Sequence, residues 1–392
     1  MSRAWHPFHR LEQFVRDYTA GLNTREFRRL FDHDAAHAYA VLTREHSQEP
    51  EPRGIGRWLY RARLAFMGLS YKLTPARRLL FALSLIFFCA GFIQKPKIVY
   101  RSATVLVSLD FSPFWFAASV ASLVYLLALE LVDRIRVRDE LEVARELQAD
   151  LLPQEVASVP AYTFAHSYRT ANEVGGDYYD ITPLPDGRVA LMMGDASGHG
   201  MAAGLVMAIA NATLKTSLDL DPSPERVVPL LNRTLCRTGT KRTFMSVFYA
   251  LLQPDLGILE YVCAGHPYPF LRRASGEIEE LGQGGLPLGL RDPLSLKCHK
   301  VALRPGDLLV MYTDGLAESV DLKGQAFGYD GIRDLLRTGG LPQTVHDRIL
   351  AAFDRHVGEE PLRDDLTLLL MARMPGGPEP TAPPTVPAAA SS

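Results

Sequence analysis

Two apolar stretches in the first third of the chain constrain its fold more than any other feature of the sequence. They cover residues 79–93 and 111–129 and are joined by a loop that contains Lys95, Pro96, Lys97 and Arg101. The second stretch is long enough to cross a bilayer as a helix. The first gives only about 22 Å of helix against a hydrocarbon core of ~30 Å, so it spans the core only if flanking basic side chains extend toward the head groups.

Basic residues outside the two stretches predict a helical hairpin across the membrane over residues 79–132. Lys72, Arg77 and Arg78 precede the first stretch, and Arg134, Arg136 and Arg138 follow the second. Because cytoplasmic flanks carry an excess of Lys and Arg, this distribution places both ends of the hairpin in the cytoplasm. We therefore expect an inner-membrane protein whose C-terminal part is cytoplasmic. The alternative is one amphipathic or buried helix followed by one true span.

The segments on either side of this hairpin carry no catalytic motif. Residues 1–78 have helical patches but no apolar run typical of a cleavable signal, and we predict a cytoplasmic helical region. Residues 133–153 are charged, with apolar residues near heptad spacing. They predict a linker helix that either pairs with a second copy of the chain or packs on its own domain. Residues 375–392 are rich in Pro and Ala and are predicted to be a disordered tail.

Composition excludes several classes of function. The formal net charge is −2 and the isoelectric point is near 6.6, so the chain lacks the basic excess that nucleic-acid binding requires. The cysteines form no CxxC pair and indicate neither a zinc site nor a disulfide framework. They are Cys89, Cys236, Cys263 and Cys298. A nucleotide-dependent kinase or ATPase is disfavoured because the sequence contains no GxxxxGK[ST] motif.

Residues 154–374 have the pattern of a mixed α/β domain, in which short β-type runs are bounded by Gly, Pro and Asp. The candidate strands are residues 188–194, 245–253, 257–264, 307–313 and 366–371. The longest candidate helix covers residues 201–218, which follow the sequence GHG and carry apolar residues along one side. The pattern therefore predicts strands and helices in one domain with its own core.

Acidic residues stand at the ends of these candidate strands, beside glycine or another acidic residue. They are Asp177, Asp195, Asp314, Asp364 and Asp365, in the local sequences GGD, GDASGHG, TDG and RDD. At any single position, Asp beside Gly is ordinary turn chemistry. Four such motifs in one domain instead indicate carboxylates gathered at a sheet edge. Oxygen ligands without Cys or closely spaced His favour hard cations such as Mg²⁺ or Mn²⁺, and several carboxylates around one cavity suit two ions better than one.

Five runs of the sequence resemble, in their order, the motifs of the PPM-type metal-dependent phosphatases, and specifically of their bacterial SpoIIE/RsbU branch. They are VGGDYYD at 174–180, GDASGHG at 194–200, AGHP at 264–267, YTDGLAE at 312–318 and DDLT at 364–367. The resemblance covers about residues 145–373. It implies an α+β fold, an α-β-β-α sandwich of two antiparallel sheets flanked by helices, which here follows an N-terminal helical and transmembrane region.

The resemblance also implies a centre of two Mn²⁺ or Mg²⁺ ions at one edge of the sandwich. By matching position, the ions would be held by Asp177, Asp195, Asp314, Asp364 and the backbone carbonyl of Ala196. Asp365 is the less favoured ligand of its pair. Ala196 stands where the branch often has Val, a change that does not affect a carbonyl ligand. Every expected carboxylate is present, so we expect the domain to be active.

The activity implied is hydrolysis of phosphoserine or phosphothreonine on a protein by in-line attack of a metal-activated hydroxide, without a phosphoenzyme. Ser197 and Ser246 are then not nucleophiles. His199 could position water or protonate the leaving group, with a structural role as the alternative, and His266 could line the entry. The usual substrate in this branch is a phosphorylated STAS-type antagonist of a partner-switching pathway. The competing hypothesis is a non-catalytic membrane scaffold that only binds a phosphoprotein.

Overall fold

The computed structural model of the chain describes residues 55–93, 98–102, 105–109, 111–153, 158–198, 200–239, 243–358 and 360–375. Residues 1–54 and 376–392 lie outside the described residues, and with them most of the predicted N-terminal region and all but the first residue of the predicted tail. The chain divides into two compact units, residues 1–135 and 136–392. Each unit is described by itself.

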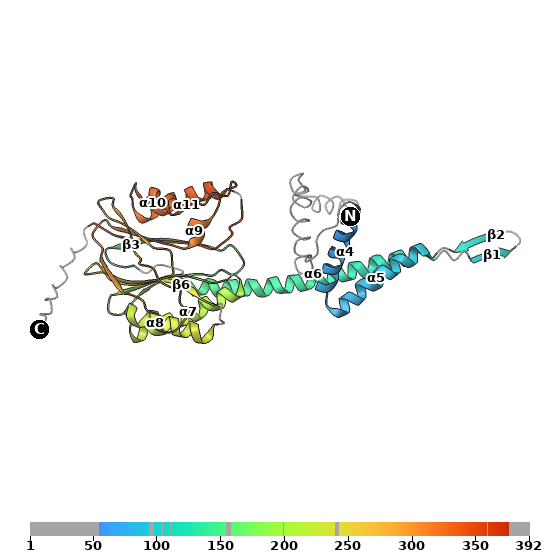
Figure 1. Cartoon of the computed structure of the whole chain (residues 1–392), viewed down its shortest axis with the longest axis horizontal. Helices are drawn as coiled ribbons and strands as arrows, with labels where there is room; N and C mark the ends of the chain where they lie inside the picture. The colour runs from blue at the N-terminus through green and yellow to red at the C-terminus, as the bar shows by residue number, and fades with distance from the viewer. Residues whose placement is uncertain are drawn as a thin grey trace, which may run out of the picture. The chain divides into compact units, whose positions relative to one another are not determined.

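In the first unit, α5 (Pro75–Ile93) and the start of α6 (Ser112–Leu151) lie side by side (Figure 1), and aromatic rings pack between them. Its other elements are α4 (Ile55–Lys72) and the hairpin of β1 (Ile98–Ser102) and β2 (Val105–Leu109). The ring centroid of Phe116 on α6 lies 5.8 Å from that of Phe88 and 5.2 Å from that of Phe92 on α5. Gly91 permits this approach, because a Cβ there would lie 2.8 Å from the Phe116 ring.

Both apolar stretches are helical, and both helices are longer than the stretches themselves. α5 has 19 residues and starts at Pro75, so it rises about 28 Å at 1.5 Å per residue. α6 has 40 residues and continues without a break through most of the predicted linker. By length and composition, α5, α6 and α7 (Met201–Leu220) are the helices in the described part of the chain that could cross a membrane. The apolar window of α7 is 39% buried, against 11% for α5 and α6, because α7 packs on a sheet of the second unit.

Two five-stranded sheets, in which every pair of neighbouring strands is antiparallel, form the centre of the second unit. The first sheet has the strand order β10-β7-β6-β5-β4, and the second has the order β3-β12-β11-β8-β9. The strands of the first are β4 (Asp177–Pro183), β5 (Val189–Ala196), β6 (Met245–Gln253), β7 (Ile258–Ala264) and β10 (His299–Ala302). Those of the second are β3 (Tyr162–Arg169), β8 (Phe270–Arg272), β9 (Ile278–Glu280), β11 (Leu308–Tyr312) and β12 (Leu366–Arg373).

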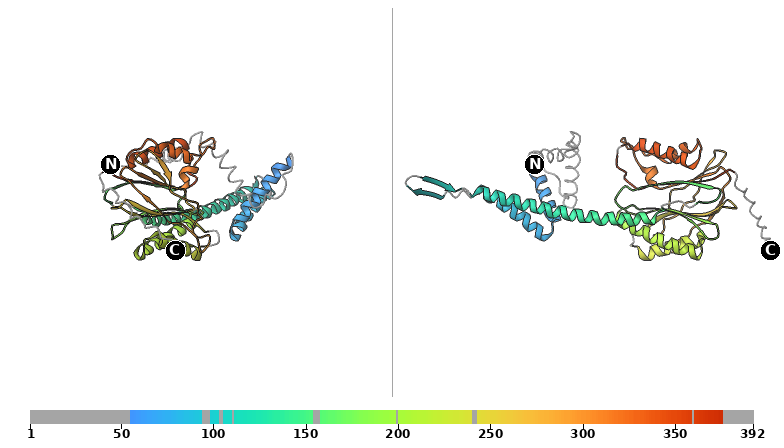
Figure 2. Two further views of the ribbon diagram at one scale, coloured as in Figure 1. Left: turned by 60° about the vertical axis from the view of Figure 1, so that its left-hand side comes forward. Right: turned by 180° about the vertical axis from the view of Figure 1, so that it is seen from behind.

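Helices cover the outer face of each sheet. On the first sheet lie α7 and α8 (Pro224–Thr238), and on the second lie α9 (Asp314–Glu318), α10 (Tyr329–Leu336) and α11 (Pro342–Val357). Figures 1 and 2 show the resulting layers from three directions, with helices, sheet, sheet and helices in that order. The predicted α-β-β-α sandwich is confirmed.

Strand β12 shows why the domain has two hydrophobic cores. Its side chains alternate between the two faces of the second sheet, as in any strand. Leu366, Leu368 and Leu370 belong to the core beneath α10 and α11, whereas Leu369 and Met371 belong to the core between the sheets. Because both faces are buried, the strand is almost continuously apolar. A polar side chain on its inner face therefore requires a specific partner.

Candidate functional site

Two of the predicted carboxylates face each other across neighbouring strands of the first sheet. Asp177 is the first residue of β4, and Asp195 pairs with it near the end of β5. Directly opposed residues of an antiparallel pair have Cβ atoms about 4.5–5.5 Å apart, so both carboxyl groups lie on the same face. Ala196 ends β5, and its amide donates a 3.1 Å hydrogen bond to the carbonyl of Gly176. The end of β5 and the loop before β4 thus form one corner of the sandwich.

Gly176 leaves open a small space that two oxygens border. A Cβ built on Gly176 would lie 2.9 Å from the carbonyl oxygen of Ala196 and 3.1 Å from Oδ1 of Asp195. The Cβ of Ala203, at 3.3 Å, closes the third side. Any side chain at this position would displace one of these neighbours. The second glycine of the VGGD run is therefore what lets a carbonyl and a carboxylate converge here.

Asp177 is held inside the sandwich by two threonines of the second sheet and its adjoining turn. Its side chain is 1% exposed, and its Oδ2 accepts hydrogen bonds of 2.7 Å from Thr313 Oγ1 and 2.6 Å from Thr367 Oγ1. Burial first, and then the charge of Asp195, raise the pKa of Asp177 well above its usual range, although the two hydroxyl donors oppose this rise. Neither threonine was predicted from the sequence, although each lies within a recognised motif, YTDG or DDLT.

The remaining carboxylates crowd around the outer side of Asp195. Burial, followed by the charges of Asp314, Asp364 and Asp365, raises the pKa of Asp195 to about 8. Burial, followed by the charges of Asp364 and Glu318, raises the pKa of Asp314 to about 6. Oδ1 of Asp314 is buried and has no hydrogen-bond partner among the described residues. Leaving such an atom unpartnered is costly, so the position suits a bound cation.

Asp364 and Asp365 are neighbours in sequence with different surroundings. Both oxygens of the buried Asp365 accept hydrogen bonds from backbone amides, Oδ1 from Ala171 at 2.7 Å and Oδ2 from Gly176 at 2.5 Å. Its carboxylate therefore fixes the loop that precedes β4. Asp364 is exposed, and its Oδ1 accepts a 2.9 Å hydrogen bond from the amide of Asp365. Of the pair, Asp364 has the carboxylate that solvent and small ligands can reach.

The fold thus gathers all five predicted aspartates, which come from four separate segments, at one edge of the sandwich. In the described part of the chain, no three Asp, Glu, His or Cys side chains already form a complete group for one ion. Backbone oxygen is part of this site, however, and Mg²⁺ commonly completes its shell with water. The raised pKa values, the partnerless oxygen of Asp314 and the space beside Gly176 all fit divalent cations.

The serine and histidine side chains near this edge are engaged in local hydrogen bonds. Ser197 Oγ accepts a 2.9 Å hydrogen bond from the amide of Phe244. Ser246 Oγ lies 2.9 Å from Nδ1 of the buried His266. Burial lowers the pKa of His266 to about 3, so this imidazole is neutral at physiological pH. His199 lies outside the described residues, and its predicted role stays a prediction.

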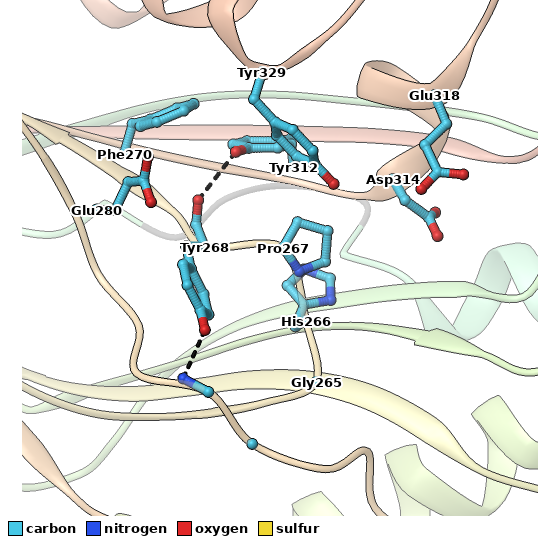
Figure 3. A pocket seen from close by; sticks show the side chains of 12 residues that line it. Gly265, His266, Pro267, Tyr268, Phe270, Glu280, Tyr312, Asp314, Glu318 and Tyr329 are labelled. Carbon is cyan, nitrogen blue, oxygen red and sulfur yellow. Dashed lines mark hydrogen bonds between the residues drawn. The ribbon is translucent and has the colours of Figure 1, made fainter. Parts of the chain in front are cut away.

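A cavity of about 520 Å³ opens beside Asp314. Figure 3 shows Tyr312 and Tyr329 along one side of it, Tyr268 along the opposite side, and Glu280 at the end away from Asp314. This aromatic lining was not predicted from the sequence. The aromatic residues come from the loop before β8, from β8, from β11 and from α10, and only the fold brings those elements together.

The C-terminal part of α6 contacts the loop that leads to Asp177. The buried Gln148 donates a 2.6 Å hydrogen bond from Nε2 to the Gly175 carbonyl and accepts a 2.9 Å hydrogen bond at Oε1 from the Gly175 amide. Its Nε2 also lies 3.0 Å from Sδ of Met207 on α7. Within the second unit, this residue joins the end of α6 to the site. In the sequence, the position of this Gln among the apolar residues of the predicted linker helix was the one sign that its side chain is buried.

Comparison with known proteins gives this domain a family. The family model of Stage II sporulation protein E (SpoIIE) matches residues 185–374. Phosphoserine phosphatase RsbU of Bacillus subtilis is 26% identical over 244 residues, which are 60% of this chain and 71% of RsbU. Protein IcfG of Synechocystis sp. is 23% identical over 276 residues, which are 63% of this chain and 43% of IcfG. The chain thus spans less than half the length of that relative.

Among solved structures, the SiaA-PP2C domain of Pseudomonas aeruginosa has the same fold. It superposes with a TM-score of 0.55 at 22% identity, and the match covers 62% of this chain and 99% of that domain. The matched part is therefore a complete domain in the second protein. The likeness supports the architecture of two sheets between layers of helices.

Proposed function

The chain belongs to the SpoIIE/RsbU branch of the PPM-type metal-dependent phosphatases, and we propose on this premise that it hydrolyses phosphoserine or phosphothreonine on a protein. The observation that carries the proposal is the gathering of Asp177, Asp195, Asp314 and Asp364 beside the carbonyl of Ala196. A relative named as a phosphoserine phosphatase supports the substrate class. The charge-crowded edge explains why such a site needs cations before it can accept a phosphoryl dianion.

The four carboxylates and the Ala196 carbonyl would hold two divalent ions, either Mn²⁺ or Mg²⁺. When bound, such ions neutralise phosphoryl oxygens and lower the pKa of water, which supplies the nucleophile for an in-line displacement at phosphorus. Asp365 is better suited to support than to ligation, because both of its oxygens accept backbone hydrogen bonds. Thr313 and Thr367 hold Asp177 in position and favour its charged form through their hydroxyl donors.

No side-chain nucleophile is required in this proposal. Ser246 is hydrogen-bonded to a histidine that is buried and neutral, and Ser197 accepts a backbone hydrogen bond. Neither serine is needed as a nucleophile, because the proposed attack on phosphorus comes from a metal-activated hydroxide. Asp314 borders the cavity, so the substrate would approach the carboxylate cluster from that side.

The apolar helices support a membrane-tethered protein with its catalytic domain in the cytoplasm, at the inner membrane. In this arrangement, residues 79–132 form the hairpin, 133–153 the linker helix, 154–374 the phosphatase domain and 375–392 the tail. The basic residues that flank the hairpin support the orientation. Exposed apolar side chains on the linker part of α6, at Ile135, Val143 and Leu147, support pairing with a second copy of the chain.

A phosphorylated STAS-type antagonist in a partner-switching pathway is the proposed kind of substrate, since the chain shares its branch with RsbU. The test uses the full chain in detergent with p-nitrophenyl phosphate and a phosphoserine peptide, in the presence of Mn²⁺ or Mg²⁺. We expect phosphate release that EDTA abolishes and excess Mn²⁺ restores, and that an Asp195→Asn variant lacks under every condition. Binding of the phosphopeptide without any release of phosphate would instead support the non-catalytic scaffold.

A further inference from the structure

The cavity beside Asp314 extends well beyond the carboxylate cluster. In the second sheet, Val310 of β11 pairs with Phe270 of β8, and Phe270 pairs with Glu280 of β9. These three residues form one row across the sheet, and Asp314 lies four residues after Val310, or ~13 Å along the chain direction. The cavity is lined from the row of Phe270 and Glu280 up to Asp314. It therefore has room for more than a phosphoryl group.

The part of the cavity away from Asp314 combines aromatic rings with acidic side chains. Figure 3 shows the rings of Tyr268, Phe270, Tyr312 and Tyr329 around it, with the Glu280 carboxylate at one end. Glu318 adds a further carboxylate near Asp314, and no Lys or Arg is among the described residues that line the cavity. Phe270 and Tyr312 are buried, so the rings that a ligand can reach are those of Tyr268 and Tyr329. This acidic and aromatic part of the cavity is suited to a cation.

Hydrogen bonds and stacking fix several of these rings in place. Tyr312 donates a 3.0 Å hydrogen bond from its hydroxyl to the Tyr268 carbonyl, and the Tyr268 hydroxyl accepts a 2.6 Å hydrogen bond from the Gly284 amide. The rings of Phe270 and Tyr312 stack with their centroids 5.5 Å apart. Tyr329 is 45% exposed and sits at the rim. The walls are thus largely preorganised for a ligand.

The protein itself already places one cation against this lining. The guanidinium of Arg333, on α10, lies 5.3 Å from the ring centroid of Phe270 and pairs with the carboxylate of Glu280. The Glu280 side chain nevertheless keeps 42% of its surface exposed. A second cation can therefore approach Glu280 from the cavity. The pair with Arg333 also holds the Glu280 carboxylate in a fixed position.

We infer that this cavity binds a lysine or arginine side chain of the phosphoprotein substrate, close in sequence to the phosphorylated residue. The inference rests on the proposed function, because it takes the carboxylate cluster as the place where the phosphoryl group reacts. An extended peptide rises about 3.3 Å per residue, so ~13 Å is about four residues, and the length of a lysine or arginine side chain brings the basic residue to within roughly three positions of the phosphoserine. Its side chain lies between the tyrosine rings with its charge toward Glu280.

The test uses the full chain in detergent with Mn²⁺ and a series of nine-residue phosphopeptides. Each peptide has a central phosphoserine in a background of Ala and Gly, and a single Arg at one position from −3 to +3. The readout is kcat/KM relative to the peptide without Arg, measured on the same protein preparation. We expect at least one position to give roughly a tenfold gain, the size of a desolvated cation–π contact combined with a carboxylate.

Variants locate the effect in the cavity. Glu280→Gln and Tyr329→Leu should each reduce the gain to below about threefold, whereas Tyr329→Phe keeps the ring and should retain the gain. Glu277→Gln is the matched control, because Glu277 is exposed and does not line the cavity. Thermal melts of each variant exclude loss of folding as the cause.

Three results would overturn the inference. The first is that no position of Arg raises kcat/KM. The second is that Glu raises kcat/KM as much as Arg does at the best position. The third is that the gain in kcat/KM survives in both Glu280→Gln and Tyr329→Leu. The first two need only the unaltered chain, so they hold even if a variant does not fold. If the unaltered chain hydrolyses the peptide without Arg, the proposed function stands whatever the Arg series shows. If it hydrolyses no phosphoester at all, the proposed function fails, and the inference fails with it.

Discussion

The inner and outer ends of the carboxylate cluster are built in different ways. At the inner end, Asp177 is buried between the sheets and receives hydrogen bonds from Thr313 and Thr367. At the outer end, Asp314 begins a helix of five residues beside the cavity, and its buried Oδ1 has no partner among the described residues. The inner end is thus completed by the protein itself. The outer end has a remaining bonding site, which a bound ion would fill.

This difference assigns separate tasks to the two ends. Hydroxyl donors stabilise the charged form of Asp177 although burial opposes it, so the inner end keeps this proposed ligand oriented before any ion arrives. At the outer end, burial and neighbouring charges raise the pKa of Asp314 to about 6, although two backbone amides oppose the rise, and its Oδ1 has no partner among the described residues. The carboxylates there are expected to change protonation when a cation binds. The following predictions test this division.

The largest effect is expected at Asp195, which lies between the two ends. Asp195→Asn should lower kcat/KM for a phosphoserine peptide by at least ~10³-fold, because it removes a ligand from a centre worth several kcal/mol of transition-state stabilisation. In EDTA at pH 8, the same variant should melt at a higher temperature than the unaltered chain, since it relieves the repulsion that raises the pKa of Asp195 to about 8. A loss of activity with a lower melting temperature would indicate a structural residue instead.

Replacing the two threonines tests whether their hydroxyl groups hold Asp177 ready to bind a cation. Replacing both, in a Thr313→Val and Thr367→Val double variant, keeps the shape but removes both hydroxyl donors to Asp177. We expect the affinity for Mn²⁺ to fall by about 10–100-fold, the usual cost of losing residues that support a metal ligand. Isothermal titration with Mn²⁺ measures it. Thr216→Val, on the exposed side of α7, is the matched control and should bind Mn²⁺ normally.

The neighbours Asp364 and Asp365 should separate activity from stability. Asp365→Asn places an amide group against one of two backbone donors, and should lower the free energy of unfolding by about 1–3 kcal/mol. Asp364→Asn should not lower the denaturation midpoint, because it removes a charge that raises the pKa values of Asp195 and Asp314, and it should weaken the response to Mn²⁺. Urea denaturation in EDTA and Mn²⁺ titration of the activity give the two readouts. The opposite pattern would exchange the roles of the two residues.

The smallest expected effect is a pH dependence of stability in the metal-free chain. The folded-state pKa values of Asp314 and Asp195 are raised to about 6 and about 8, so the folded state binds these protons more tightly than the unfolded state does. The stability they contribute is fully present below about pH 4 and is lost as pH rises through 6 and then 8. The melting temperature in EDTA should therefore fall by several degrees between pH 5.5 and 8.5, at roughly 2–4 °C per kcal/mol.

Two comparisons control this pH measurement. In Asp195→Asn, the upper part of the decline should be absent, because the group that titrates near pH 8 is gone. With saturating Mn²⁺, the decline should disappear, because a bound cation holds the carboxylates in their charged form and its affinity rises with pH. If the melting temperature falls with pH equally in Asp195→Asn and in the unaltered chain, and equally in EDTA and in Mn²⁺, groups other than Asp195 and Asp314 cause the fall.

Much of the fold was predictable because its signals are local. The strands at 245–253 and 366–371 show up as apolar runs between turn residues, and β6 and β12 are found there. The aspartates were predictable for the same reason, since each stands beside glycine or another acidic residue at a strand end. The short motifs could also be compared with a known family, and that resemblance implied two antiparallel sheets flanked by helices, which no single motif shows.

Other parts of the site depend on contacts between distant segments, and the sequence alone did not predict them. The hydrogen bonds from Thr313 and Thr367 to Asp177 join two sheets, across 136 and 190 positions of sequence. The aromatic lining of the cavity likewise requires α10 and the loop before β8 to meet. Gln148 stands among the apolar positions of the predicted linker helix, which could have marked it as buried, but its partner Gly175 could not be read from the sequence.

The strand order of the second sheet has a consequence for biosynthesis. β12 is the last of the described strands along the chain, yet it lies between β3 and β11. Before residue 364 leaves the ribosome, β3 is therefore separated from the three strands β11, β8 and β9, and Asp364, Asp365 and Thr367 are still missing. The nascent protein therefore cannot form the carboxylate site until the last strand of this domain has been synthesised.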